Sequence, residues 1–255
     1  MTLTTQGIVL HTTKYGETSI IAKVFTRQLG LCSYIVKGVR SPKGRTKQNL
    51  LQPMSHLMMT VYNNPKKQLQ YIKEMHPASR VDNLYSDGLK MSLLFFMDEV
   101  LYKSIKESEP NESLFDYVVD ELQQMNTTTP PQSHSSTFTY FPIRFLLRTA
   151  RHLGIEPMDN YSVREPVFNL KEGRFLAAPT VYSASTNDNI NYFLDGSASY
   201  SFHDCLSSFT QRGIEPHLSP VQRANTLNNL LEYYHIHLSD FHNFTSHQIL
   251  HSVLR

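Results

Sequence analysis

The chain has 255 residues, of which 40% are hydrophobic and 18% charged, a balance typical of a globular protein and unlike that of a disordered one. Its two cysteines, Cys32 and Cys205, lie far apart, which excludes a disulfide framework and the paired cysteines of a zinc ribbon. No apolar run reaches the roughly 18 residues of a membrane span, and the first residues lack the pattern of a secretory signal. We therefore expect a protein of the reducing cytoplasm that does not enter a membrane.

The net charge of +2 conceals an uneven distribution along the chain. Residues 1–80 contain 12 lysines and arginines but only two acids, Glu17 and Glu74, which gives this part a net charge of +10. Residues 81–255 contain the other 12 basic residues and 20 acids, which gives −8. Such asymmetry indicates that the first part binds a polyanion, although a solvated basic face has the same composition.

The first 80 residues have the pattern of short β-strands. Five segments are rich in β-branched and aromatic residues that partly alternate with polar ones, and turn-forming residues separate them. These segments are residues 4–12, 18–26, 31–39, 55–63 and 67–75. Five short strands predict a small closed barrel, for which the oligonucleotide-binding fold is the common solution, while an SH3-like barrel fits the same pattern. The basic stretch at 39–49, with Pro42 and Gly44, predicts an exposed loop.

Beyond about residue 81 the apolar residues recur at the three- and four-residue steps of helices, as Leu89, Leu93 and Phe96 do. The expected helices lie near residues 89–105, 113–122, 141–154, 201–212, 221–238 and 246–254. Residues 126–137 predict a flexible connection, and residues 155–200 an irregular segment with one candidate hairpin at 167–179. The predicted fold class is α+β, with a five-stranded oligonucleotide-binding β-barrel domain at 1–80 and a mainly α-helical domain at 81–255.

The segment 7–44 resembles the opening of RecO proteins, in which a Y-x-E-T/S pair of strands is followed by a segment of the form "vFT…Gl…vKGvR". The matching residues are Tyr15, Glu17, Thr18, Phe25, Thr26, Gly30, Lys37, Gly38 and Arg40. Residues 50–57 resemble the next block of that family, and residues 143–157 and 230–250 resemble its helical domain. Many RecO proteins carry four zinc-binding cysteines after the third helix. Here residues 155–205 offer only Cys205, so the chain resembles zinc-free members, and we expect no metal or other cofactor.

The resemblance implies an oligonucleotide-binding barrel, a helical domain that binds protein partners, and no catalytic activity. It implies a mediator of recombinational repair that binds single- and double-stranded DNA and anneals complementary strands. With RecR, and often RecF, such a mediator helps to load RecA onto strands coated by single-stranded-DNA-binding protein. A bacterial cytoplasmic location follows, with association with the nucleoid while DNA is bound.

A cluster of cations in the predicted loop is the candidate DNA-binding site. Its members are Lys37, Arg40, Lys43, Arg45 and Lys47, and Lys14, Lys23 and Arg27 are candidates to extend it. Cations of this kind bind phosphates by releasing counterions and need not read any base sequence, which suits a protein that acts on any DNA. Tyr15, Tyr34, Tyr62 and Tyr71 could stack on bases, but barrel interiors also need large side chains, so the core is the favoured place for each.

Arg144, Arg148 and Arg151 are spaced to lie on one face of a helix beside apolar residues. A cationic stripe bordering an apolar surface suits an acidic peptide with an apolar residue and a carboxylate at its end. The C-terminal tail of single-stranded-DNA-binding protein has that character, and RecO proteins bind it on the helical domain. A solvated helix face fits the three arginines equally well.

Two other functions fit parts of the sequence. An RNA-binding barrel protein would have the same strands and basic loop, and only the resemblance in the helical part speaks against it. A metal-dependent phosphodiester hydrolase would need ligands from the histidine-rich tail, yet His235 and His237 are spaced to point apart, and His247 and His251 lack the glutamate of an HExxH motif. We therefore expect structural or surface histidines.

Overall fold

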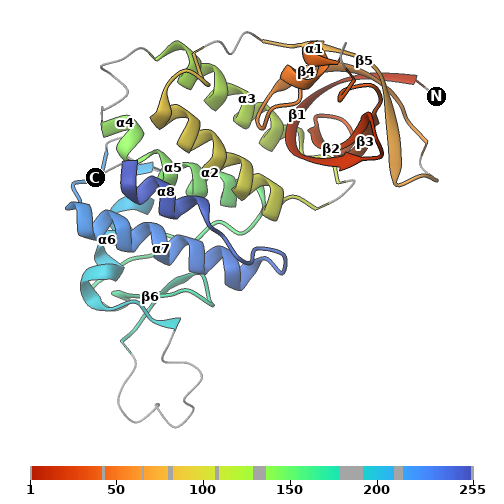
Figure 1. Ribbon diagram of the computed structural model, residues 1–255. Coiled ribbons are helices and arrows are strands. Elements are labelled where there is room, and N and C mark those ends of the chain that lie inside the picture. The colour runs from red at the N-terminus through yellow and green to blue at the C-terminus, as the bar shows by residue number, and fades with distance from the viewer. Residues whose placement is uncertain are drawn as a thin grey trace. The chain divides into compact units, whose positions relative to one another are not determined.

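The computed structural model describes residues 2–41, 44–64, 66–79, 83–106, 109–128, 136–178, 192–209 and 215–253. The chain forms two compact units, Met1–Thr129 and Pro130–Arg255 (Figure 1). The first unit thus joins the predicted barrel to the first two long helices. The division into domains at residues 80 and 81 stays a prediction.

Five strands close into a barrel in the first unit. They are β1 (Thr2–Tyr15), β2 (Ser19–Thr26), β3 (Gly30–Val36), β4 (His56–Tyr62) and β5 (Leu69–Pro77). The order around the barrel is β1-β2-β3-β5-β4, and β1 closes it by pairing with both β2 and β4. Only β3 and β5 run parallel. This arrangement is that of the oligonucleotide-binding fold, and it confirms the predicted fold class and all five predicted strands.

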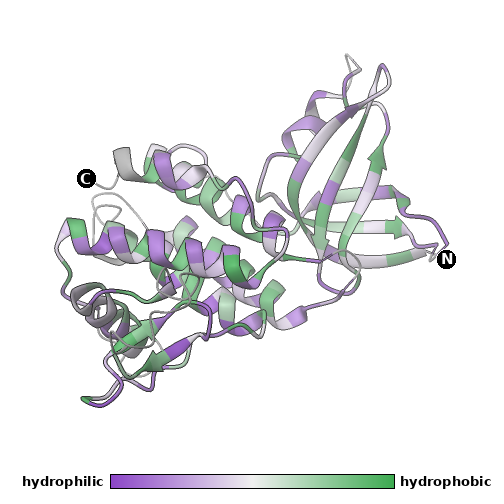
Figure 2. Cartoon of the chain, turned by 90° about the horizontal axis from the view of Figure 1, so that it is seen from below, coloured by the Kyte–Doolittle hydropathy of each residue, from purple (hydrophilic) through white to green (hydrophobic). Residues whose placement is uncertain are grey.

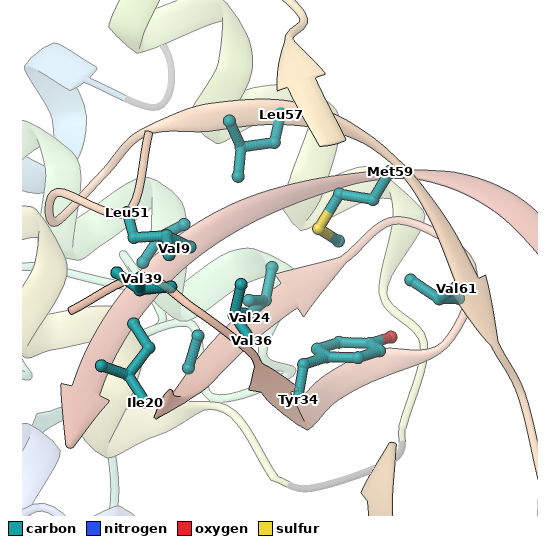
Figure 3. Packing of buried hydrophobic residues seen from close by; sticks show 11 residues of the cluster. Val9, Ile20, Val24, Tyr34, Val36, Val39, Leu51, Leu57, Met59 and Val61 are labelled. Carbon is teal, nitrogen blue, oxygen red and sulfur yellow. The ribbon is translucent and has the colours of Figure 1, made fainter. Parts of the chain in front are cut away.

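Alternate residues of the strands fill the barrel interior (Figure 3). Val9, Val24, Met59 and Val61 are fully buried there, around the ring of Tyr34. Burying one such side chain contributes roughly 1.5 to 3 kcal/mol, so this cluster holds the strands in one register. In the view of Figure 2, polar residues share the same strands with hydrophobic ones.

A short helix that the sequence did not predict, α1 (Arg45–Asn49), follows β3 within the expected exposed loop. None of its residues is buried. A helix of five residues is too short to show helical periodicity in the sequence, whereas Pro42 and Gly44 are residues typical of turns. The prediction of a loop over the whole of 39–49 was therefore wrong, whereas the predicted exposure of the segment is confirmed for α1.

Two long helices complete the first unit, α2 (Gly88–Ser104) and α3 (Glu112–Thr127). Asp87 caps α2 by accepting hydrogen bonds from two backbone N–H groups, and Asn111 caps α3 by accepting one. The predicted apolar face of α2 is buried. From α3, the ring of Phe115 packs edge-on against that of Phe25 in the barrel, with 5.4 Å between the ring centroids.

The second unit is mainly helical. Its elements are α4 (Ser136–Thr139), α5 (Phe141–His152), β6 (Val167–Asn169), β7 (Arg174–Leu176), α6 (Gly196–Ser207), α7 (Pro220–His237) and α8 (Ser246–Val253). The expected hairpin is present as β6 and β7, and α6 begins about one turn earlier than predicted because Asp195 caps it. Within the described ranges, no helix is long and apolar enough to cross a membrane.

Aromatic packing joins described parts of residues 155–205, the segment for which the sequence led us to expect no zinc site. Phe168 of the hairpin packs against Phe202 of α6, and the Tyr161 ring stacks on His203 at 4.3 Å. His203 Nδ1 lies 2.6 Å from Asp159 Oδ1. Cys205 of α6 is buried, and burial raises the pKa of its thiol. The donors present do not fit zinc, because a structural zinc site needs four convergent ligands, and the described residues contain no cluster of three.

Candidate nucleic-acid interface

Strand register decides which predicted cations share one end of the barrel. Lys14 is paired with Ile20 on β2, and Ile20 is paired with Val36 on β3. Lys37 follows Val36 directly, so Lys14 and Lys37 lie at the same end of the barrel. Arg27 follows β2 at the other end, where Thr26 pairs with Gly30.

Arg40 tethers the segment after β3 to the turn between β1 and β2. Its backbone N–H donates to the carbonyl of Thr18 at 3.0 Å, and its guanidinium donates to the carbonyl of Gly16 at 3.1 Å. Gly44 lets the same segment fold back on itself, because a Cβ at this position would collide with the backbone oxygens of Gly38 and Val39. The described part of the segment that carries the predicted cations is thus fixed by contacts with that turn and by its own close backbone approach.

A groove of about 390 Å³ lies beside this loop, at one end of the barrel. Lys37 and Lys47 both line it, together with Tyr62 of β4 and Tyr71 of β5. Lys37 Nζ lies 5.3 Å from the centroid of the Tyr71 ring, close enough for a cation–π contact. The structure therefore brings two of the predicted DNA-binding lysines into one site. Arg45 is exposed at the start of α1, the helix that also carries Lys47. Lys43 lies outside the described residues.

A second pair of cations, which we did not single out from the sequence, adjoins the groove. Lys66 and Lys67 are exposed in the turn that connects β4 to β5, and Tyr62 and Tyr71 lie near the base of that turn. The buried side chain of Gln70 shapes the turn, because it donates to the carbonyl of Asn64 and accepts from the Asn64 N–H. The adjacent lysines after a turn-forming Asn-Pro were the signal that could have found this pair.

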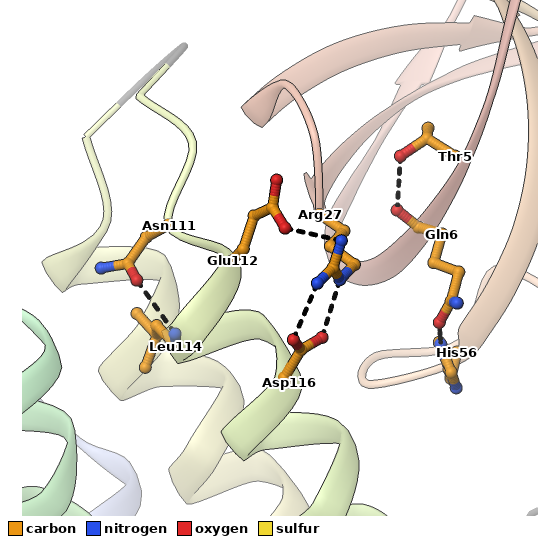
Figure 4. A network of polar contacts seen from close by, with 8 residues as sticks. All are labelled: Thr5, Gln6, Arg27, His56, Asn111, Glu112, Leu114 and Asp116. Atoms are coloured by element: carbon orange, nitrogen blue, oxygen red, sulfur yellow. Dashed lines mark hydrogen bonds and ion pairs between the residues drawn. The ribbon is translucent and has the colours of Figure 1, made fainter.

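Arg27 does not belong to this group, because it contacts two acids of α3, as Figure 4 shows. Its guanidinium donates two hydrogen bonds to the carboxylate of Asp116, at 2.8 and 3.0 Å, and lies 2.6 Å from Glu112. The hydrogen bond to Asp116 raises the pKa of Arg27, and the same bond lowers the pKa of Asp116. Arg27 therefore joins the barrel to α3. Lys23 also contacts a helix, with its ammonium 5.6 Å from the Tyr102 ring of α2.

The four tyrosines considered from the sequence divide into two kinds. Tyr34 is fully buried in the barrel core, as favoured, and burial raises the pKa of its hydroxyl. Tyr15, Tyr62 and Tyr71 are exposed by 47%, 47% and 38%, so the favoured core position was wrong for these three.

The three predicted partner-binding arginines lie on α5 of the second unit. Arg144 is half-buried with its guanidinium over the Phe141 ring, Arg148 is exposed, and Arg151 lies 3.7 Å from Glu156. Nearby, a pocket of about 410 Å³ is lined by apolar residues of α5, α7 and α8, including Ile143, and by the cation Arg223. Arg223 was missed because it comes from a different helix, α7, which only the tertiary structure brings to α5.

Two histidines of the C-terminal region have structural contacts, as expected. His237 Nε2 hydrogen-bonds to the Leu170 carbonyl at 2.9 Å, and His235 Nδ1 to the Phe241 carbonyl at 3.1 Å. For the histidine-rich tail, too, the described residues offer no cluster with enough ligands for a metal ion. The side chain of His251 lies outside the described residues.

Comparisons with known proteins agree with these features. The family models for the N-terminal and C-terminal parts of recombination protein O match residues 1–80 and 85–164. A DNA repair protein RecO of Christiangramia forsetii is 29% identical to this chain, and the match covers 99% of both proteins. RecO proteins of Flavobacterium psychrophilum and Bacteroides fragilis are each 28% identical, over 99% and 93% of both chains. From these matches, together with the barrel and the helical region that follows it, we conclude that the chain belongs to the RecO family of DNA repair proteins.

Proposed function

We propose that this protein is a non-enzymatic mediator of recombinational repair. It binds single- and double-stranded DNA, anneals complementary strands, and assists the loading of RecA together with RecR and often RecF. Membership of the RecO family supports this role, and with it a cytoplasmic location in which the protein joins the nucleoid while DNA is bound. The observation that carries the proposal is the groove at one end of the barrel in which Lys37 and Lys47 converge.

The arrangement suits contact with phosphates more than recognition of base sequence. Lys14, Arg40, Arg45, Lys66 and Lys67 add positive charge around the two lysines of the groove, and Lys43 belongs to the same loop. Each phosphate that a cation neutralises releases counterions, which makes binding strong at low salt and independent of sequence. Neutralising two strands at once lowers their mutual repulsion, so complementary bases can pair. Arg27 lies outside the interface that we propose.

The experiment measures DNA affinity and strand annealing for the double variant Lys37→Glu/Lys47→Glu. The matched control is Lys106→Glu, which reverses the charge of an exposed lysine that lies outside the groove. Losing two phosphate contacts should flatten the plot of log affinity against log salt by about 1.4 for single strands. The double variant should anneal slowly, and the control should behave as the unaltered protein. A folded double variant with unchanged affinity and salt dependence would refute the proposal.

We also propose that the second unit binds the C-terminal tail of single-stranded-DNA-binding protein. The apolar pocket offers a place for an apolar terminal residue, and Arg223 in its lining, with Arg144 of α5, offers charge for carboxylates. Arg148 and Arg151 extend the cationic side of α5.

The test is binding of a fluorescent peptide with the sequence of that tail, compared with a peptide that lacks its last residues. Arg223→Glu should abolish binding of the complete peptide, whereas Arg164→Glu, which alters an exposed arginine outside the pocket, should not. Equal binding of the two peptides would contradict the proposed site.

A further inference from the structure

The groove of the barrel presents two tyrosine rings on the same face. Tyr62 and Tyr71 are paired across β4 and β5, and paired residues of neighbouring strands point to the same side of the sheet. Val61 belongs to the barrel core and Ile72 packs against it, so the adjacent tyrosines point outward. Their side chains are exposed by 47% and 38%, so both rings are accessible to a ligand.

The lining of the groove combines aromatic faces, aliphatic side chains and positive charge. Ile35 and Ile72 form part of its wall, and Lys37 and Lys47 supply the ammonium groups. The volume of about 390 Å³ lies at the lower end of the roughly 300 to 1,000 Å³ that pockets for small molecules occupy, which is the size class of a nucleotide. The lysines complement a phosphate, and the rings complement the face of a base.

From this geometry we infer that Tyr62 and Tyr71 form a stacking site for unpaired bases of single-stranded DNA, while Lys37 and Lys47 contact the flanking phosphates. The bases of a duplex are already stacked inside the helix and cannot offer their faces to the tyrosines. The site therefore favours single strands over duplex and holds the bases of a strand splayed before it pairs. Every base has a π-face, so the site is tolerant of sequence.

This inference rests on the proposed DNA binding and makes a separate prediction. Removing base–aromatic stacking costs about 1 to 3 kcal/mol per base, so Tyr62→Leu/Tyr71→Leu should weaken binding of an oligothymidylate at least 5-fold and up to about 150-fold. Affinity for a fully paired duplex without a single-stranded loop should stay unchanged, and the salt dependence should keep its slope because no phosphate contact is lost. The conservative pair Tyr62→Phe/Tyr71→Phe keeps both rings and should bind as the unaltered protein does.

The control is Tyr200→Leu, which removes another exposed tyrosine from α6, outside the barrel. Circular dichroism establishes that each variant is folded. If the leucine variant does not fold, photocrosslinking of the unaltered protein to an oligonucleotide containing 5-iododeoxyuridine replaces it, and the crosslink should map to Tyr62 or Tyr71 by mass spectrometry.

Several outcomes would overturn the inference, and they differ from failure of the proposed function. A folded leucine variant with unchanged single-strand affinity, equal losses for single strand and duplex, or a crosslink elsewhere would each remove the stacking site while DNA binding through the lysines stands. Stronger competition by an oligouridylate than by the oligothymidylate would assign the site to RNA. If the unaltered protein bound no DNA, that result would refute the proposed function itself.

Discussion

Replacing Asp98 with asparagine should stabilise the first unit near neutral pH. Asp98 lies on α2, and its Oδ1 atom is buried without a hydrogen-bond partner among the residues that the structure describes. Burial, followed by the neighbouring charge of Glu99, raises the pKa of the Asp98 carboxyl from 3.8 to about 8. The carboxyl thus stays protonated over much of the range in which an exposed aspartate is ionised.

The size of the effect follows from the two pKa values. Because the folded state binds the proton more tightly than the unfolded state, the free energy of unfolding falls as the pH rises from about 4 to about 8. The fall is about 1.4 kcal/mol per pH unit, which amounts to about 1.6 kcal/mol at pH 5 and about 4 kcal/mol at pH 7. These are upper values, because relaxation of the surroundings reduces the penalty for a buried charge. Asparagine does not titrate, so its advantage should grow with pH.

Urea unfolding of the full chain, followed by circular dichroism at several values between pH 5 and pH 8, measures this advantage. The control Asp120→Asn removes an exposed carboxylate of α3, and its effect should change little with pH. The reasoning is refuted if Asp98→Asn shifts the unfolding free energy equally at pH 5 and pH 7, or lowers it at both.

Three further changes test other contacts. Gly30 has a φ of +70°, and a Cβ there would lie 2.5 Å from the Glu109 carbonyl oxygen. Gly30→Ala should therefore lower the free energy of unfolding by about 1 to 3 kcal/mol. An unchanged urea midpoint would contradict this. Gly44→Ala should displace α1 and weaken single-strand binding without unfolding the barrel, as binding titrations with circular dichroism can establish. Asp159→Asn weakens the bond to His203 and should cost about 1 to 3 kcal/mol, seen as faster hydrogen exchange in α6; equal protection would argue against that role.

Apart from the short helices α1 and α4, the sequence by itself determined the kinds of element and their order. The five strands were predictable because β-branched and aromatic residues fill short segments between turn-forming residues. The apolar face of α2 was predictable from three- and four-residue steps. The concentration of positive charge before residue 80 was likewise a property of the sequence alone, and it pointed to the barrel as the DNA-binding part.

Only the tertiary structure decided which of these residues share a site. Lys37 and Arg27 look alike in sequence, yet barrel closure places them at opposite ends, and the carboxylates that bind Arg27 come from α3, almost 90 residues later. Tyr34 and Tyr71 both stand in strand patterns, and the pairing of β3 with β5 sends one ring inward and the other outward. A strand pattern specifies that side chains alternate between two faces. Which face points into the barrel depends on pairings between distant segments, which local sequence does not encode.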